Sequence, residues 1–402
     1  MAKLTIYLCA LQLAAIYSTN LPLPIFGSSI ALVGVLLCMA WGINLIFSQS
    51  VRRVHLVHIL ILCFFAWSSL TFLWSEDRAA TFAYSISYIR YFILIYIFWD
   101  IIDTHEKLIL CMKGSIVGAS FAILSQLFSY AIGSDIGGGR YSAADFDPNY
   151  YGVLLATAIP IAWYLSIVAK SRLMIMFYIL FIPMAIVGGG ILSGSRTGFL
   201  LTSLASLYPV WTFISRSRNV RDLVLSKFKV ALICMLLLIA TGGFVQLISM
   251  GAFDRIATLW DGSANTTSLG NRTYLWGDAL ERISENFFGG IGAGSFKSTS
   301  YIASEELRAH NTYLSVLVET GSIGFMFLIL ILSIVYWKAY QERDRAYRAC
   351  WATMLSVLYI GIFTLTWEAR PYMWLIMTMP LINSSNQTEQ NQSNVAEEYS
   401  DV

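Results

Sequence analysis

The chain has 402 residues, of which 57% are hydrophobic and only 12% are charged. Soluble domains carry roughly 25% charged residues, so the composition excludes an ordinary soluble domain. The formal net charge of +2 gives no sign of nucleic-acid binding, and no nucleic-acid partner is expected. Apolar runs of about 20 residues, enough to cross a bilayer, recur along nearly the whole sequence. They predict an all-α polytopic membrane protein.

Twelve membrane spans are predicted in chain order. The first is short and follows Lys3, so a cleaved signal peptide is an alternative; no clear small-residue cleavage site follows it, which favours an uncleaved span. The spans are predicted at residues 4–18, 28–47, 56–74, 80–102, 108–133, 150–169, 172–192, 197–215, 229–250, 312–337, 349–366 and 371–385.

Lysine and arginine are unevenly divided between the two sets of connections. With the N-terminus inside, fifteen of the 26 basic residues fall in cytoplasmic connections, whereas the short outward connections hold four. Basic residues are enriched on the cytoplasmic side of membrane proteins, so this orientation is predicted. The four outward residues are Arg78, Arg140, Arg196 and Arg370.

The connection 251–311 then faces outward and is too long to be a simple turn. Within it, residues 275–283 predict an amphipathic helix on the membrane surface. Residues 1–385 form one transmembrane domain that includes this loop, and the polar tail 386–402 is predicted to be disordered and cytoplasmic. A flexible turn is predicted at Gly289, Gly290, Gly292 and Gly294.

Cysteine and histidine usage argues against a bound metal or cofactor. All six cysteines lie in or beside apolar segments, so neither disulfides nor a cysteine metal site is predicted. The spacing of His55 and His58 could suit a metal, but no carboxylate or cysteine lies nearby, which favours an interfacial, non-ligand role.

His310 is the one histidine of four that the predicted orientation places outside. Histidine is well suited to act as a base near neutral pH, although an inert interfacial residue is the alternative on position alone. It begins a string that extends to Gly324, in which Gly321 and Gly324 are expected to let another helix approach closely.

Two arginines share the predicted outer face with His310. Arg196 lies in a short turn rich in serine and glycine, and Arg272 lies just before the amphipathic segment. The alternative for Arg196 is a snorkelling residue at the membrane interface. The alternative for Arg272 is a solvated charge in the loop. Guanidinium groups form paired, charge-assisted hydrogen bonds with phosphate. One base and two arginines together suit metal-free transfer from a lipid pyrophosphate.

Charged residues inside the predicted spans are expected to face the bundle interior. They are Arg90, Lys113 and Glu319. Arg90 could reach the phosphate cavity, and a structural pair between an internal cation and Glu319 is the alternative. In the last outward turn, Glu368 and Arg370 are expected to bridge to each other.

These motifs resemble those of the O-antigen ligase family, which includes Wzy-type polysaccharide polymerases. The family's signature of His-Asn, nine residues, Gly, two residues, Gly is complete from His310 to Gly324. The resemblance covers about residues 70–375. Further similar stretches lie at Trp74–Asp77, Asp147–Asn149, Ser195–Thr197, Gly270–Arg272 and Asn286–Gly294.

The resemblance implies a helical glycosyltransferase of the GT-C-like kind in the bacterial inner membrane, with its active site facing the periplasm. It implies that His310 is the base and that Arg196 and Arg272 bind undecaprenyl pyrophosphate, with inversion at the sugar carbon and no metal. Arg140 and Asn149, with Asn311 beside the base, are assigned more weakly to the same cavity.

The acceptor is left open by the sequence. It can be a sugar hydroxyl of the lipid A core, as in a ligase, or of a growing carrier-linked polysaccharide, as in a polymerase. A protein O-oligosaccharyltransferase and a lipid-linked-sugar flippase are the alternative functions.

Overall fold

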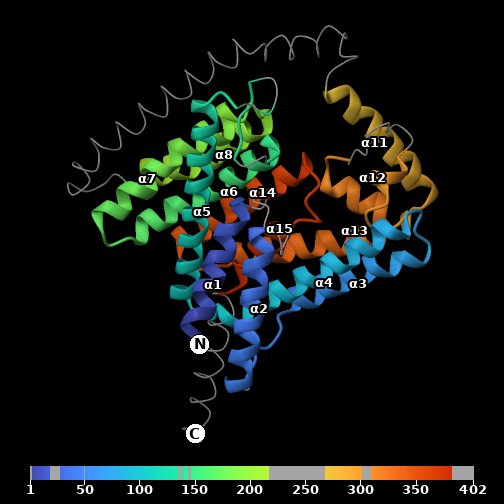
Figure 1. Ribbon diagram of the computed structural model, residues 1–402, viewed down its shortest axis with the longest axis horizontal. Coiled ribbons are helices and arrows are strands. Elements are labelled where there is room, and N and C mark those ends of the chain that lie inside the picture. Colours follow the sequence, from blue (N-terminus) through green and yellow to red (C-terminus); the bar gives the residue numbers. More distant parts are fainter. Residues whose placement is uncertain are drawn as a thin grey trace.

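The computed structural model describes residues 2–18, 28–48, 50–134, 136, 139–143, 146–216, 268–300 and 309–382, without the side chains of residues 2, 213–216 and 268–273. All regular structure in these residues is helical (Figure 1). The elements are α1 Ala2–Ala15, η1 Ile16–Ser18, α2 Ser29–Ser48, α3 Leu56–Leu70, η2 Thr71–Leu73, α4 Arg78–Ile101, α5 His105–Ala131, α6 Pro148–Val168, α7 Arg172–Ile186, η3 Val187–Leu192, α8 Arg196–Arg216, α11 Ser268–Glu285, α12 Phe296–Thr299, α13 Thr312–Tyr340, α14 Arg345–Phe363 and α15 Pro371–Thr378.

Within the described residues, the predicted spans agree with these helices in position and, with one exception, in length. Eight helices within the described residues are long and apolar enough to cross a membrane, and a shorter apolar helix covers residues 3–18. The predicted span 229–250, the first part of the loop 251–311 and the tail 386–402 lie outside the described residues. The prediction of a polytopic helical protein is therefore confirmed, and the count of twelve spans stays a prediction.

Polar side chains fix where several helices begin. Asp147 caps α6 by accepting the backbone N–H groups of Asn149 (2.8 Å) and Tyr150 (3.2 Å). His55 and His58 form a reciprocal capping box at the start of α3. Each cap satisfies N–H groups that have no partner within the helix. The structural role of this histidine pair is therefore to cap the start of α3.

The starts of α4, α6, α8 and α13 lie at one end of the bundle with residues 364–370, which join α14 to α15; we call this the His310 end. Contacts described below connect these segments. Within the bundle, α6 is almost wholly buried and packs against α5, α7, α8 and α14. The helices α3, α4 and α13 form a second group, with α11 and α12 near one of its ends (Figure 1).

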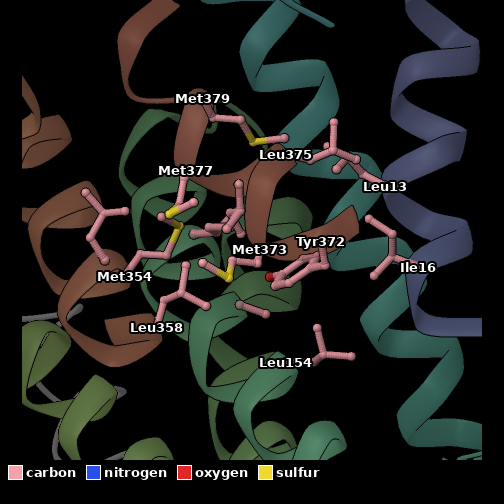
Figure 2. Packing of buried hydrophobic residues seen from close by; sticks show 14 of the residues in the cluster. Leu13, Ile16, Leu154, Met354, Leu358, Tyr372, Met373, Leu375, Met377 and Met379 are labelled. Atoms are coloured by element: carbon pink, nitrogen blue, oxygen red, sulfur yellow. The ribbon is translucent and has the colours of Figure 1, made fainter. Parts of the chain in front are cut away.

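The predicted span 371–385 is wrong in length. The helix α15 has eight residues, about 12 Å of helix, which is far short of a bilayer. Its side chains from Tyr372 to Thr378 are buried; Leu375 lies near Leu13 of α1, and Tyr372 lies near Ile16 of η1 and Leu154 of α6 (Figure 2). The apolar run that suggested a span is therefore a short helix enclosed by others.

The helix α13 is broken at Gly321, where the sequence predicted a continuous span. Gly321 has φ 67° and ψ −172°, which interrupts the helical hydrogen bonds. The carbonyls of Val318 and Glu319 accept instead the N–H groups of Ile291 (3.0 Å) and Gly292 (2.9 Å). Backbone groups left unpaired within a membrane are costly, so the 286–295 turn stabilises the break by satisfying them.

The hydrogen bonds between the 286–295 turn and α13 correct two expectations for the long loop. The glycine turn is not flexible, because its backbone is hydrogen-bonded to α13 and residues 290–295 are buried. The helix α11 is amphipathic as predicted but begins at Ser268. Its apolar residues Leu275, Ala279 and Ile283 pack with Val318 of α13. Protein, and not the membrane surface, covers this apolar face.

Candidate active site

Three glycines bring together the elements that carry Arg196. A Cβ atom on Gly152 of α6 would lie 2.6 Å from the Cα of Gly198 in α8 and 2.8 Å from the carbonyl oxygen of Gly189 in η3. These three backbones are therefore as close as glycine alone allows. Because η3 is π-helical, it departs from the regular helix just before the turn 193–195. The contact fixes the position of that turn against α6.

The turn Ser193–Gly194–Ser195 gathers three of the predicted site residues. Ser195 Oγ donates to Asn149 Oδ1 (2.8 Å), and Arg140 Nε donates to the Ser193 carbonyl oxygen (3.1 Å). The stem of Arg140 also lies against Gly194. Arg196 follows immediately and is exposed at the first turn of α8.

The local charge at this turn favours an anion. Ser195 Oγ accepts the Gly198 N–H (3.0 Å) as the cap of α8, a helix of 21 residues whose N-terminal dipole is positive. The guanidinium groups of Arg140 and Arg196 add to the same field. This arrangement could bind a phosphate group without further basic residues.

His310 lies where the chain enters α13. It is half-buried, and its φ of 49° is the single positive value among the described non-glycine residues. Such a backbone persists only where the surroundings enforce it and is frequent at functional sites. On one side, Asn311 caps α13 by accepting the Leu314 N–H (3.2 Å), and on the other, Trp276 Nε1 of α11 donates to the Ala309 carbonyl oxygen (2.8 Å). The histidine is therefore held from both neighbouring residues.

The connection 364–370 joins the Arg196 turn to the start of α13. Thr312 Oγ1 donates to the Leu365 carbonyl oxygen (2.7 Å) and accepts the Trp367 N–H (2.9 Å). The Tyr150 hydroxyl, from the α6 residue after Asn149, donates to the Thr366 carbonyl oxygen (2.5 Å). His310, Arg140, Asn149 and Arg196 thus share one end of the bundle.

Arg272 is placed by its backbone alone. It lies in α11, one helical turn before Trp276, which contacts the residue preceding His310. Its side chain lies outside the described residues. The helix that carries Arg272 is therefore docked beside His310, and the role of the guanidinium stays a prediction.

The sequence did not single out Arg282, although it is central to this docking. Its side chain is buried and donates to Glu76 Oε2 (2.6 Å), Asp278 Oδ1 (3.0 Å) and Thr299 Oγ1 (3.0 Å). Burial alone would lower the pKa of Arg282, but Asp278 and Glu76 outweigh it and raise the pKa. The i, i+4 spacing of Asp278 and Arg282 was the available signal.

The turn before α4 is held to the same segment. Asp77 caps α4 through the Ala80 N–H (3.0 Å) and accepts the Ser298 hydroxyl (2.5 Å). The Ser298 hydrogen bond, with the Ala80 N–H, lowers the pKa of Asp77. The string Trp74–Asp77, noted in the sequence for its resemblance alone, is therefore the attachment point of the 268–300 segment.

The expectation that all three intramembrane charges face the interior is wrong for two of them. Arg90 is exposed and donates to Ser87 Oγ (2.9 Å) within α4, and Lys113 is also exposed. Apolar neighbours fill the interior, so the long basic side chains extend outward. Glu319 is buried as expected, and its carboxylate accepts the Gly294 N–H (2.7 Å).

Other predicted contacts also differ in detail. Glu368 accepts the Ser315 hydroxyl (3.0 Å), whereas Arg370 lies over the Tyr150 ring (4.8 Å), so each has a partner other than the expected bridge. At Gly324 the approaching segment is α3 through Trp67, as predicted, but at Gly321 it is the 287–289 turn and not a helix. No group of three potential metal ligands is found within the described residues.

The helices and the site define the class: a multi-pass, all-α membrane protein whose polar groups converge on one end of the bundle. Comparison adds a likeness over part of the chain: residues 184–329 match the O-antigen ligase family model. The match confirms the predicted resemblance and supports a role in O-antigen or polysaccharide assembly. It includes Arg196, Arg272 and His310. No curated protein matches the chain.

Proposed function

We propose that this protein transfers a glycan from undecaprenyl pyrophosphate to a sugar hydroxyl on the outer side of the bacterial inner membrane, with inversion and without a metal ion. The observation that carries the proposal is the shared position of His310 and the Arg140–Asn149–Arg196 group at one end of the bundle, joined through residues 364–370.

The arginine group would bind the pyrophosphate of the donor. Arg140 and Arg196, together with the N-terminus of α8, supply positive charge where the leaving group becomes more negative. Arg272, carried on α11 beside His310, would complete the set. Paired hydrogen bonds from guanidinium groups hold phosphate in one orientation.

His310 would act as the general base. In the proposed reaction, the acceptor hydroxyl attacks the anomeric carbon on the face opposite the pyrophosphate, and its proton passes to the imidazole. The bond between the anomeric carbon and the phosphate oxygen breaks, and undecaprenyl pyrophosphate leaves with that bonding pair. The fixed backbone on both sides of His310 supports this role, because a base must be held at its target.

The test is glycan transfer by the purified full chain in liposomes. The donor is the lipid-linked glycan extracted from cells that lack this gene. The His310→Ala variant is expected to lose at least about 100-fold in kcat, the lower range for general-base catalysis. A core glycolipid and a second carrier-linked repeat are supplied in separate reactions, and the acceptor that is extended distinguishes a ligase from a polymerase.

The matched control is His55→Asn. His55 caps α3 at the opposite end of the bundle, and asparagine can also cap a helix, so this variant is expected to retain wild-type transfer. Undiminished transfer by a folded His310→Ala protein would rule out the base assignment.

A further inference from the structure

A cavity opens at the His310 end beside the proposed phosphate-binding group. The cavity has a volume of about 80 Å³ and is open to the surface. It is smaller than the roughly 300–1,000 Å³ of whole small-molecule sites, so it would hold one part of a larger glycan. The residues that line it come from the ends of α1, α2 and α6 and from the connection into α15. Among the described residues these are Ile16, Ile30, Phe146, Asp147, Tyr150, Leu154, Trp367, Arg370, Pro371 and Tyr372.

One part of the wall is a cluster of aromatic rings. Tyr150 and Trp367 stack with centroids 5.5 Å apart, and Tyr372 meets Trp367 edge-on at 5.9 Å. The guanidinium of Arg370 lies 4.8 Å from the centroid of Tyr150 and is exposed. A flat ring with an open face can bind the C–H face of a sugar, and a charged group at its edge can bind the hydroxyls. Tyr150 and Arg370 are accessible for such contacts, whereas Trp367 and Tyr372 are buried in the wall.

Two buried polar atoms beside the cavity lack partners within the described residues. They are the indole nitrogen of Trp367, which lines the cavity, and Oγ1 of the preceding Thr366. Leaving such a group unsatisfied costs about 1–3 kcal/mol, and native proteins rarely do so without a reason. A polyhydroxylated ligand that reached them would remove this cost.

The wall of the cavity is connected to both parts of the proposed active site. Tyr150 follows Asn149, which holds the Arg196 turn, and the Trp367 N–H is bound by Thr312 at the start of α13. A sugar attached to a pyrophosphate at Arg196, or a sugar whose hydroxyl faces His310, would therefore lie close to this wall.

We propose that this cavity is a binding subsite for a sugar ring adjacent to the bond that is transferred. The proposal rests on the proposed function, which supplies the glycan. The ring can belong to the donor or to the acceptor, and the two sources share the same chemistry.

The experiment measures KM for the donor and for the acceptor in the liposome assay. Trp367→Phe keeps an aromatic ring and removes the N–H, and Arg370→Gln removes the charge. Each is expected to raise one of the two KM values about tenfold, the effect of one hydrogen bond to a charged or polar ligand group, with kcat changed less than about twofold. The matched controls are Trp351→Phe, fully buried in α14, and Arg78→Gln, exposed at the start of α4; both should leave the KM values unchanged.

A higher donor KM assigns the ring to the donor, and a higher acceptor KM assigns it to the acceptor. Unchanged KM values, or a fall in kcat alone, would overturn the subsite. If the wild-type chain transfers nothing, the proposed function fails. The subsite is then tested separately, by measuring how the protein binds the free oligosaccharide that mild acid releases from the donor. Binding that Trp367→Phe weakens about tenfold supports the subsite, whereas equal or absent binding rejects it.

Discussion

At the scale of single residues, Gly321 combines two requirements. Its φ of 67° and ψ of −172° lie in a region that only glycine adopts without strain, and a Cβ atom there would clash with the Phe288 carbonyl oxygen. The sequence signature indicated that this glycine matters. It did not indicate the reason, because a break in a helix depends on the segment that satisfies the freed carbonyls.

We expect Gly321→Ala to destabilise the protein by at least about 1–3 kcal/mol from backbone strain alone, with further loss as the 287–289 turn is displaced. Thermal unfolding in detergent measures the change. The matched control is Gly277→Ala in α11, where nothing lies within 4 Å of the added Cβ. This variant should be neutral or more stable by up to about 1 kcal/mol. Equal melting temperatures for the two variants would contradict the account.

At the scale of elements, α11 depends on contacts that are distant in sequence. Arg282 joins it to Glu76 before α4 and to Thr299 in α12, and Trp276 joins it to Ala309. Helical periodicity predicted an apolar face correctly. The period alone could not say whether lipid or protein covers that face, because both are apolar.

Arg282→Met is expected to release the 268–300 segment from the bundle. Asp278, which is buried, would lose its cationic partner. The cost should be at the low end of the roughly 3–5 kcal/mol for breaking a buried pair, because Glu76 is partly exposed. Limited proteolysis and hydrogen exchange of residues 268–300 measure the release. Glu281→Gln removes an exposed charge from the same helix and should change neither reading; equal protection of both variants would exclude the docking role.

At the scale of the whole molecule, the distribution of basic residues predicts that the His310 end faces outward. Cysteines introduced by Arg78→Cys and Arg343→Cys, in a protein without its native cysteines, test this because both positions are exposed at opposite ends. A membrane-impermeant maleimide is expected to label position 78 in intact cells and position 343 only after lysis. The reverse pattern would invert the orientation and remove the periplasmic active site.

The sequence by itself determined the helical, multi-pass class, the positions of most helices and the family motif. These features depend on local composition, helix caps and the length of apolar runs. The tertiary structure alone decided that α15 is enclosed, that α13 is broken and that Arg282 fastens α11, because burial and satisfaction of backbone groups depend on partners far away in the chain. The grouping of Arg140 and Asn149 with Arg196 was predicted from the resemblance and from their position at the outer mouth of a neighbouring span, and contacts through one short turn bring the three together.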